Sequence, residues 1–505
     1  MSSIQPLQDP CVVDAVGEDL RAAGYTSDGV GALLGDDANE ALGRGVWWPA
    51  MRATRQAPSE KQALATIVRL FLLGSREPED TVAESFPSTS VDRLIAEGVL
   101  SRESDGTIRA ILDIRPHADD VRDYLVVSDQ DAVMWSAPVA HDHVLGIGGA
   151  SVSLARAIIR QPAGRVLDIG TGCGIQALHL DTHCNEIVAT DTNHRALALA
   201  AATARLNGMT WDLRAGSLFE PVAGERFDLI VSNPPFVVGA GAQDYIYRDS
   251  GMVGDTICAA LIRQLPDHLN PGGTAQLLAN WIVPVDADWR DRVRGWLEGT
   301  GLDAWVVQRE LADPISYISL WLSDAGEGAH DAAERGADWL DWFGAEGIAG
   351  IGMGLITLRK RAVGETGEPD QVLEEITGAG GEVTGPEADA FLTRRRYLRT
   401  TSDNHLLAAR LATAPVFLEE QSLPSDEGWQ QVSAAVRRPG GPGAVLGVDE
   451  VSRALLAGCR GEVPLGALIE LLADFHGVDT DALAQAALPV VREAIGRGIL
   501  FEVQN

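Results

Sequence analysis

Short apolar runs alternate with helical patterns through the middle of the chain. The first run, Val166, Leu167 and Ile169, has the length and composition of a strand buried in a parallel sheet. Helical patterns at 175–180, 193–206 and 256–265 separate it from later runs. The strand-like runs lie at 165–169, 186–191, 211–214, 227–231, 274–279, 303–309 and 351–358. This alternation predicts an α/β domain.

The two flanks follow other patterns. The N-terminal flank is mainly helical and ends in a helix-like stretch, 91–100, followed by a predicted hairpin with Asp105-Gly106 as its turn. The C-terminal flank begins with a stretch rich in Gly, Glu and Thr, then shows strand-like runs at 416–423 and 429–437 and helices from 448 onward. We expect three parts: an N-terminal helical, winged-helix-like module (1–120), a central α/β domain (121–362) and a C-terminal α+β module (363–505).

A weak internal similarity links the flanks. Residues 491–500, Val-Arg-Glu-Ala-Ile-Gly-Arg-Gly-Ile-Leu, match residues 91–100, Val-Asp-Arg-Leu-Ile-Ala-Glu-Gly-Val-Leu, in pattern. Two copies do not make a solenoid. They predict two similar helical modules on either side of the central domain.

A glycine-rich turn follows the first central strand. Gly170, Gly172 and Gly174 alternate there, and glycine lets a ligand approach the backbone closely. The second strand ends in Asp191, whose carboxylate is placed to accept hydrogen bonds from ribose hydroxyls. This combination predicts an adenosine-containing cofactor. The spacing G-x-G-x-G differs from the G-x-G-x-x-G of dinucleotide binders, and a dehydrogenase is a distant alternative.

The fourth strand runs directly into Ser-Asn-Pro-Pro-Phe, residues 232–236. Together with Val-Leu-Asp-Ile-Gly-Thr-Gly-Cys-Gly (166–174) and the strand-end Asp191, this motif resembles the class I S-adenosylmethionine-dependent methyltransferases. Within them it is similar to the N-methylating branch that contains release-factor glutamine methyltransferases. The resemblance covers residues 140–285. It implies a Rossmann-like, seven-stranded sheet and S-adenosylmethionine as cofactor.

The resemblance also implies roles for individual residues. The Asn233 side chain and the Pro234 carbonyl would accept the two N–H bonds of a planar acceptor nitrogen, so that its lone pair faces the donated methyl group. Pro235 stiffens the loop because its φ is fixed, and Phe236 offers a flat apolar face. The catalytic contributions are positioning and preorganised electrostatics. The residues expected to bind the cofactor are Asp168, Gly170, Thr171, Gly172, Gly174, Asp191, Thr192, Ser217, Leu218 and Asn233.

Some positions depart from the family pattern. Many relatives carry an Asp where Ser217 stands, which puts the adenine contact in doubt. The stretch Tyr245–Asp255 resembles one that follows the same loop in glutamine N5-methyltransferases, but Ser250 replaces a Gly and Phe236 replaces the usual Tyr. About forty residues, 311–347, separate the last two strands, which usually form a tight hairpin. This insertion is either a lid or a packing excursion.

The composition limits which kinds of partner the protein can bind. The 505 residues carry a formal net charge of −32, which opposes extended binding to phosphate backbones, although a local basic patch can still bind a compact RNA site. Five cysteines without a C-x-x-C pair fit a reducing cytoplasm. We expect a cytoplasmic enzyme without a signal peptide or membrane span. We expect no metal, since His141 and His143 lack further ligands at suitable spacing.

The methyl acceptor stays open between two classes. The Tyr245–Asp255 stretch and the acidic charge slightly favour a protein side chain of the glutamine-amide type. The Asn-Pro-Pro-Phe form and the winged-helix-like flank favour an RNA base, guanine N2 or adenine N6. A scaffold that binds the cofactor without transferring a methyl group is a distant third.

Two further features have competing interpretations. The dense positive run Arg394–Arg399 either contacts an acidic or phosphate-bearing partner or, as we prefer, pairs with this protein's own acids. Trp47 and Trp48 are either an exposed contact patch or, as we prefer, core aromatic residues.

Overall fold

The computed structural model describes residues 5–119, 121–131, 139–241, 244–324, 329–376, 381–426 and 428–503. The chain divides into two compact units. The first comprises Met1–Ala155, Gln161–Leu302 and Glu310–Gly367, and the second comprises Arg156–Arg160, Asp303–Arg309 and Glu368–Asn505. No described helix is long and apolar enough to cross a membrane.

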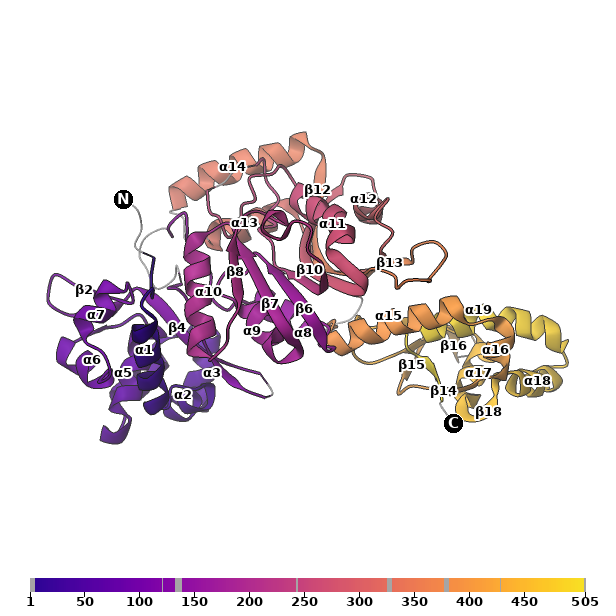
Figure 1. The fold of residues 1–505 in the computed structure, drawn as a ribbon. Helices are drawn as coiled ribbons and strands as arrows, with labels where there is room; N and C mark the ends of the chain where they lie inside the picture. The colour runs from indigo at the N-terminus through magenta and orange to yellow at the C-terminus, as the bar shows by residue number, and fades with distance from the viewer. Residues whose placement is uncertain are drawn as a thin grey trace. The chain divides into compact units, whose positions relative to one another are not determined.

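The central domain is built on a mixed sheet with helices on both of its faces (Figure 1). In the described residues this sheet has eight strands in the order β13-β11-β12-β10-β9-β6-β7-β8. Strands β6 to β9 and the start of β10 are parallel, whereas β12 runs antiparallel to β10. The strands are β6 (Ala163–Ile169), β7 (Cys184–Asp191), β8 (Asp212–Ala215), β9 (Phe227–Ser232), β10 (Leu269–Pro284), β11 (Asp303–Ala312) and β12 (Ile348–Arg359).

This sheet confirms the predicted α/β fold, with two differences. An additional strand, β13 (Gln371–Glu375), pairs in parallel with β11, although it lies in the stretch rich in Gly, Glu and Thr for which no strand was predicted. Strand β10 begins at Leu269, before the expected start at residue 274, and its pairing with β9 shifts register between Leu269 and Thr274. The helices of the domain are α8 (Gly149–Ala157), α9 (Ile175–Leu180), α10 (His194–Leu206), α11 (Thr256–His268), α12 (Trp289–Leu297), α13 (Pro314–Asp324) and α14 (Ala329–Ala345).

The N-terminal part of the first unit is mainly helical, as predicted. Its three short strands form an antiparallel sheet in the order β1-β3-β2, and the predicted hairpin joins β2 to β3. A two-stranded ribbon of β4 and β5 follows. The elements are α1 (Pro10–Ala22), α2 (Ser27–Leu34), α3 (Asp36–Gly43), α4 (Trp48–Arg55), α5 (Gln62–Phe71), β1 (Arg76–Glu77), α6 (Glu79–Ser85), α7 (Val91–Ala96), β2 (Leu100–Arg102), β3 (Ile108–Ala110), β4 (Leu112–Ala118) and β5 (Asp123–Asp129).

The preferred interpretation of Trp47 and Trp48 as core residues is wrong. Their exposed fractions are 53% and 60%. The buried face of α4 is formed instead by Ala50 and Thr54, which are four residues apart and therefore lie on one side of the helix. Small side chains at these positions let α4 pack closely, and the tryptophans remain at the surface.

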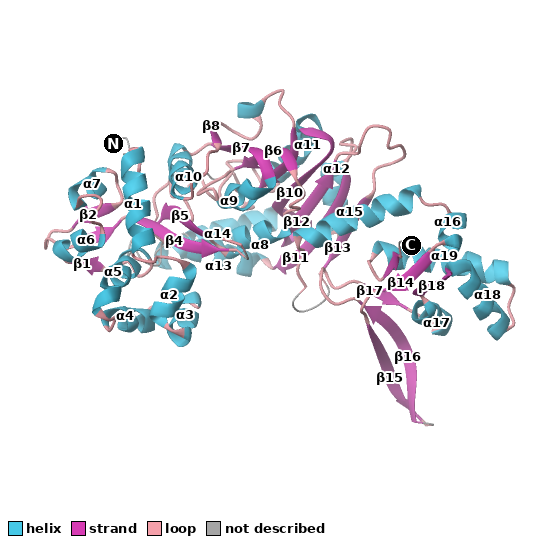
Figure 2. Ribbon diagram, turned by 60° about the horizontal axis from the view of Figure 1, so that its bottom comes forward, coloured by secondary structure: helices cyan, strands magenta, loops and turns pink. Residues whose placement is uncertain are grey.

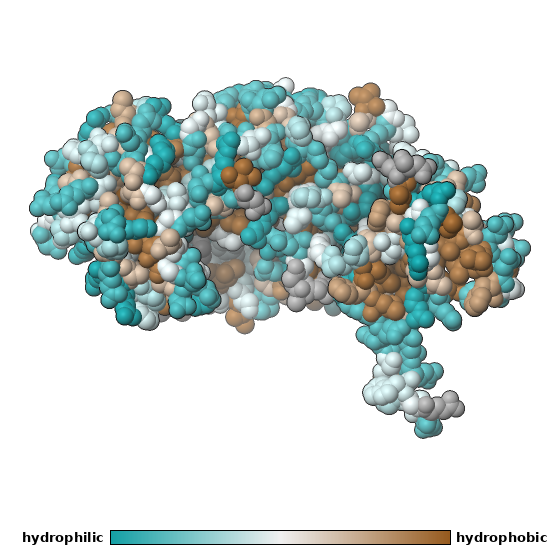
Figure 3. All heavy atoms as spheres, turned by 90° about the horizontal axis from the view of Figure 1, so that it is seen from below, coloured by the Kyte–Doolittle hydropathy of each residue, from teal (hydrophilic) through white to brown (hydrophobic). Residues whose placement is uncertain are grey.

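The C-terminal module contains two three-stranded sheets, with orders β18-β14-β19 and β15-β16-β17. Strands β15 and β16 form a long hairpin that projects from the module (Figure 2). The face of the hairpin seen in Figure 3 is hydrophilic to neutral, but Phe417, Leu423 and Val432 are also exposed on these strands. The elements are α15 (Gly385–Thr400), α16 (Asp403–Ala408), β14 (Arg410–Thr413), β15 (Phe417–Ser425), β16 (Gly428–Arg437), β17 (Val445–Gly447), α17 (Glu450–Gly458), β18 (Arg460–Pro464), α18 (Leu465–His476), α19 (Thr480–Gly496) and β19 (Leu500–Glu502).

The internal sequence similarity has a structural counterpart. After α7, Gly98 adopts φ 70° and the Val99 N–H donates to Leu94 O (2.9 Å); after α19, Gly498 adopts φ 71° and the Ile499 N–H donates to Ala494 O (2.8 Å). Both turns lead into an edge strand, β2 or β19, that pairs antiparallel with a central strand. In the N-terminal sheet, the central strand β3 follows the edge strand β2 in the chain. In the C-terminal sheet, the central strand β14 instead precedes the helices α17, α18 and α19 that lead to β19. We infer that the two small sheets share one arrangement whose chain order is permuted.

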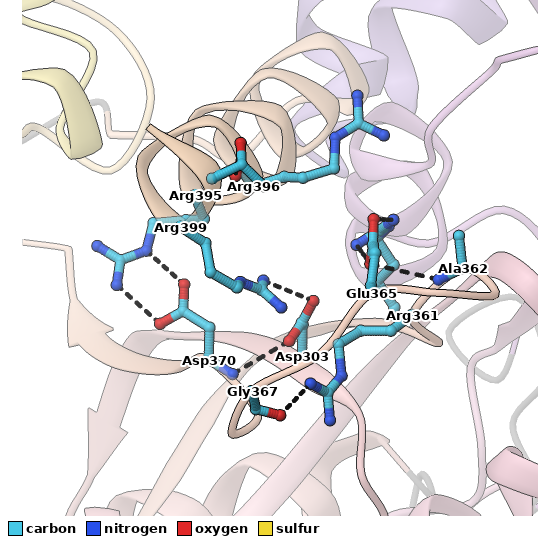
Figure 4. A network of polar contacts seen from close by, with 11 residues as sticks. Asp303, Arg361, Ala362, Glu365, Gly367, Asp370, Arg395, Arg396 and Arg399 are labelled. Carbon is cyan, nitrogen blue, oxygen red and sulfur yellow. Dashed lines mark hydrogen bonds and ion pairs between the residues drawn. The ribbon is translucent and has the colours of Figure 1, made fainter. Parts of the chain in front are cut away.

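The positive run on α15 pairs with acids of its own unit, as preferred from the sequence. Arg395 binds Asp370 through two 2.7 Å contacts, and Arg399 binds Asp303 at 2.9 Å (Figure 4). Glu387 of α15 is bound by two arginines: Arg394 of the same helix and Arg438, which directly follows β16. These pairs tie α15 to the β11–β13 edge and to β16.

Candidate functional site

A cavity of about 560 Å³ opens at the carboxyl ends of the parallel strands. Its walls come from the segments that directly follow β6, β7, β8 and β9, which is where ligands bind in open α/β sheets. The predicted site residues that line it are Gly170, Thr171, Gly172, Asp191, Thr192, Ser217, Leu218, Asn233, Pro234 and Pro235. Tertiary structure thus brings ten of the predicted positions to one cavity.

The glycine turn packs against the end of β7. The N–H groups of Gly170 and Thr171 both donate to Thr190 O, at 2.8 and 3.0 Å. Gly170 and Gly172 have φ of 72° and 55°, a region that side chains with a Cβ rarely adopt. Gly174 has a different role, because it does not line the cavity and a Cβ on it would lie 2.6 Å from the ring of Trp211. Glycine is required at this position because a larger residue would collide with Trp211.

Asp191 connects the glycine turn to the next helix. Its Oδ2 accepts from Gly172 N (3.0 Å) and its Oδ1 from Asn193 N (2.8 Å). Burial raises the pKa of Asp191, against the lowering effect of these backbone N–H groups. Each carboxylate oxygen has a second lone pair available for a ligand hydroxyl. The geometry therefore fits a ribose at this position.

Asp168 lies beneath the turn and does not line the cavity. It is fully buried, and its Oδ2 accepts from the Thr171 hydroxyl at 2.7 Å. Burial raises the pKa of Asp168 to about 7, although the Thr171 hydrogen bond lowers it. Asp168 therefore acts on the cavity through Thr171, whose position it fixes.

The loop after β9 carries the predicted acceptor group. Ser232 anchors its start, because the Ser232 hydroxyl donates to Ile169 O at 2.9 Å. Asn233 lines the cavity, and its buried Oδ1 accepts no hydrogen bond from any described residue. An unpaired buried amide oxygen is costly unless a ligand supplies the missing donor. Phe236 does not line the cavity; its ring stands edge-on to Trp321, with 6.3 Å between centroids.

The Ser217–Leu218 segment forms the wall after β8. Leu218 adopts φ 49°, an uncommon conformation for a residue with a branched side chain. Such strained backbone is concentrated at ligand sites. The sequence could not reveal this strain, since nothing in the local composition requires it.

Several cavity residues were not predicted as site residues. Gln176 of α9 and Thr190 of β7 line the cavity, and Gln176 Oε1 and Thr190 Oγ1 are buried without a hydrogen-bond partner among the described residues. The remaining additions come mainly from the segments 141–151 and 246–250 and from α10 and α11. The glycines at 146 and 148 and the Tyr245–Asp255 stretch were the available signals. Within the described part of the chain, no three His, Cys, Asp or Glu side chains are grouped to hold a metal ion.

The insertion between β11 and β12 forms a packed wall beside the loop that follows β9. Tyr317 and Phe343, from α13 and α14, are fully buried against Val237 and Val238, just beyond Phe236. The Tyr317 hydroxyl accepts from Val238 N at 2.9 Å, and Trp339 Nε1 donates to Val238 O at 3.0 Å. Both backbone groups of Val238 are thus held by the insertion. This contact pattern is that of a packed element.

A smaller cavity, about 60 Å³, lies between this wall and the loop after Phe236. Asp249 and Ser250 line both cavities, so the two adjoin. Arg248 is 2% exposed and stacks over Tyr245 at 4.5 Å. The Tyr245–Asp255 stretch therefore forms part of the site.

The central part of the chain matches known protein families. Residues 146–293 match the family model described as methyltransferase small domain. Residues 22–111 and 389–502 match two families described as domains of unknown function, DUF7059 and DUF7782. The family models thus distinguish both flanks from the centre.

Curated relatives match part of the chain. A release factor glutamine methyltransferase of Geobacter sulfurreducens is 37% identical over 135 residues, which are 24% of this chain and 48% of that protein. A ribosomal RNA small subunit methyltransferase C of Alcanivorax borkumensis is 29% identical over 171 residues, 33% of this chain and 47% of that protein. The matches span about half the length of these two relatives.

Among solved structures, a T. thermophilus 16S rRNA N2 methyltransferase in complex with AdoMet and guanosine is 15% identical, with a TM-score of 0.30. It covers 61% of this chain, and this chain covers 71% of it. The family match is the stronger finding, and it coincides with the resemblance noted in the sequence. Residues 146–293 of this chain therefore belong to the methyltransferase small domain family, within the class I S-adenosylmethionine-dependent methyltransferases.

Proposed function

We propose that the protein transfers a methyl group from S-adenosylmethionine to a planar nitrogen of a macromolecule. The observation that carries this proposal is the buried Oδ1 of Asn233, which lines the cavity without a partner among the described residues. An acceptor NH2 group supplies the hydrogen-bond donor that this oxygen lacks. The glycine turn and Asp191 fit the ribose and methionine parts of the cofactor.

Each residue of the site has a defined task. When bound, S-adenosylmethionine supplies an electrophilic methyl group. Asn233 Oδ1 and the Pro234 carbonyl accept the two N–H bonds of the acceptor and turn its lone pair toward that methyl group. Asp191 holds the ribose hydroxyls, and Leu218 lies at the adenine. Methyl transfer would form the N–CH3 bond as the S–CH3 bond breaks and S-adenosylhomocysteine leaves. The oxygens of Asn233 and Pro234 stabilise the positive charge that develops on the acceptor nitrogen until its proton passes to solvent.

The first candidate acceptor is a protein side-chain amide of the glutamine type. The Tyr245–Asp255 stretch, which resembles glutamine methyltransferases, contributes to the wall of the cavity, and the Geobacter relative is named for this activity. The second candidate is a guanine or adenine amine in RNA. The Alcanivorax relative is named for ribosomal RNA, and the exposed Trp47 and Trp48 favour a nucleic-acid contact.

The flanking parts are proposed to serve acceptor binding. In this organisation residues 1–120 and 363–505 recognise the macromolecule, and residues 121–362 perform the transfer. Their separate family matches at 22–111 and 389–502 support a division of tasks. A cytoplasmic location fits five cysteines with no disulfide among them.

The test is methyl transfer from labelled S-adenosylmethionine to a cell lysate, followed by digestion with protease or ribonuclease. Label released only by protease supports the amide acceptor, and label released only by ribonuclease supports the RNA base. Asn233→Ala should lower transfer by about 100-fold or more, which is a larger effect than any loss of cofactor affinity. Tight cofactor binding without any transfer by the unmodified protein would contradict the enzymatic proposal and leave a cofactor-binding scaffold.

A further inference from the structure

Helix α4 presents aromatic and basic side chains on one exposed face. Trp48, Arg52 and Arg55 are spaced by four and then three residues, so they form one stripe along the helix. Trp47 precedes this stripe directly. Trp47, Trp48, Arg52 and Arg55 are all exposed, and we call them the α4 face.

The charge of this segment is opposite to that of the chain. Residues 41–61 hold four basic side chains and one acidic side chain, within a protein of net charge −32. Arg44 pairs with Glu40 of α3. Arg52 and Arg55, by contrast, have no hydrogen bond or ion pair with any residue that the structure describes. Most of the protein's arginines are bound to acids, so unpaired neighbours at helical spacing are a distinct feature.

The opposite face of α4 is firmly held. The Thr54 carbonyl accepts from Arg69 Nη1 at 3.3 Å, and Arg69 is itself fixed by two contacts to Glu77, at 2.8 and 2.9 Å. Arg69 and Glu77 are 7% and 6% exposed. The exposed face therefore belongs to a helix whose opposite side is held in place, and little ordering is required when a ligand binds.

A structural role explains only part of this face. Basic residues in the last turn of a helix interact favourably with its carbonyl end, which accounts for Arg52 and Arg55. It does not account for two adjacent tryptophans that are more than half exposed. Exposed large aromatic residues beside unpaired cations are the combination used to bind single-stranded nucleic acid, with bases stacked on the rings and phosphates at the cations.

We propose that the α4 face binds a single-stranded segment of RNA. Trp47 and Trp48 stack on bases, and Arg52 and Arg55 neutralise adjacent phosphates. RNA is the chosen occupant because an RNA amine is the second candidate acceptor. The rest of the acidic surface repels the nucleic acid, but at physiological salt charges more than about 8 Å away are largely screened. The contact is therefore local and short.

The choice of RNA rests on the proposed function, but RNA binding can be tested without methyl transfer. Binding is measured with the full-length protein, without cofactor, by the fluorescence anisotropy of a labelled, unstructured RNA of about 12 nucleotides. A failure of the proposed enzymatic function would leave this measurement unaffected. Conversely, a lack of RNA binding would leave a protein acceptor possible.

The variants separate stacking from charge. Trp47→Ala with Trp48→Ala should weaken binding by roughly 5- to 100-fold per stacked base that is lost. Trp47→Phe with Trp48→Phe keeps an aromatic face and should restore most of the affinity. Arg52→Gln with Arg55→Gln should weaken binding and reduce its salt dependence. Since all four side chains are exposed, unchanged circular dichroism and melting temperature are expected for each variant.

Matched controls come from the C-terminal module. Trp429 is 78% exposed, on a hairpin whose nearby charges at 419, 420 and 426 are acidic. Arg396 is exposed and makes no side-chain hydrogen bond or ion pair with the described residues. Trp429→Ala and Arg396→Gln remove the same residue types elsewhere and should leave RNA affinity unchanged.

Four results would overturn the proposal: no RNA binding by the unmodified protein, equal binding by the Trp47→Ala, Trp48→Ala variant, an equal loss in the Trp429→Ala control, or tighter binding of DNA of the same sequence. Competition by a poly-glutamate peptide at the same charge concentration would assign the face to an acidic protein segment instead. Specific loss in the α4 variants, with preference for RNA, supports the proposal.

Discussion

Helices α4 and α15 use the same residue types in opposite ways. On α15, Arg394, Arg395 and Arg399 all bind carboxylates, and Phe391 stacks on the buried Trp305 with ring centroids 4.1 Å apart. On α4, the arginines are unpaired among the described residues and the tryptophans are exposed. The denser positive run is therefore structural, and the sparser one is available to a ligand.

The difference lies in where acids are placed in space. Asp303 and Asp370 lie 67 residues apart along the chain, yet both face α15, where the Asp370 N–H donates to Asp303 Oδ1 at 3.1 Å (Figure 4). The arginines of α4 have no such partner among the described residues, and the nearest ion pair along the chain, Arg44 with Glu40, lies at the end of α3. Counting charges along a sequence therefore does not identify a binding surface. Only the charges that remain unpaired in the folded structure indicate such a surface.

The largest expected contrast concerns tryptophan. Trp305→Ala removes a fully buried ring and its hydrogen bond to Glu374, and should destabilise the C-terminal unit by about 4 kcal/mol. Trp48→Ala removes an exposed ring and should change stability by less than about 0.5 kcal/mol. Denaturant unfolding of each variant measures both values. Equal losses would break the comparison, because they would mean that α4 needs its tryptophan for folding.

The second contrast concerns carboxylates. Glu387 is held by Arg394 and Arg438, and its side chain is only 12% exposed. Glu387→Ala leaves two partly buried guanidinium groups without a partner and should cost about 3 kcal/mol. The matched change Glu40→Ala breaks an exposed pair with Arg44 and should cost about 0.5 kcal/mol or less. A small loss for Glu387→Ala would mean that the α15 pairs contribute little to stability.

Lowering the pH should weaken the ion pairs that hold α15, whereas α4 has no such pairs to lose among the described residues. Burial raises the pKa of Glu387, but the hydrogen bonds and charges of Arg438 and Arg394 outweigh it and hold that pKa below its ordinary value of 4.5. The ionised form therefore stabilises the fold above pH 4.5, and this contribution is lost as pH falls through the lower, folded-state pKa. Melting temperature should fall in this range less steeply for Glu387→Gln. Parallel curves for both proteins would contradict this.

The smallest expected effect is a change in salt dependence. If Arg52 and Arg55 each contact one phosphate, Arg52→Gln with Arg55→Gln should reduce the slope of log affinity against log salt by about 1.4. Arg396→Gln should leave the slope unchanged. Anisotropy titrations over a range of salt concentrations provide the measurement. An unchanged slope in the α4 variant would place the phosphate contacts elsewhere.

The parts of the fold that were predicted correctly are those with strong local signals. The apolar strands of the central sheet, the glycine turn and the Asp105-Gly106 hairpin depend on patterns within a few residues. Strand β13 was missed because Gln371–Glu375 carries only two apolar residues, and it becomes a strand by pairing with β11. Trp47 and Trp48 were misplaced because hydrophobicity alone does not state which face of a helix is covered.

The same distinction between local sequence signals and long-range contacts applies to the candidate site. Its motif residues were found because their chemistry is tied to short spacings, as in the glycine turn and the Asn-Pro-Pro-Phe loop. Gln176 and Thr190 were missed because each is an ordinary residue inside a helix or strand. The placement of Asp168 and Gly174 behind the cavity wall also depends on neighbours, Thr171 and Trp211, that only packing brings close.

The sequence by itself therefore determined the α/β class of the centre, the resemblance to methyltransferases and the Asn-Pro-Pro-Phe loop proposed to bind the acceptor, because these depend on local backbone and side-chain chemistry. Only the tertiary structure decided which arginines are paired, which tryptophans are exposed and that α13 and α14 pack against Val237 and Val238. These outcomes depend on contacts between residues far apart in the chain, for which the sequence carries no short-range signal. The buried oxygen of Asn233 depends on both local and long-range contributions: the motif supplies the amide, and the fold leaves its oxygen without a hydrogen-bond partner among the described residues.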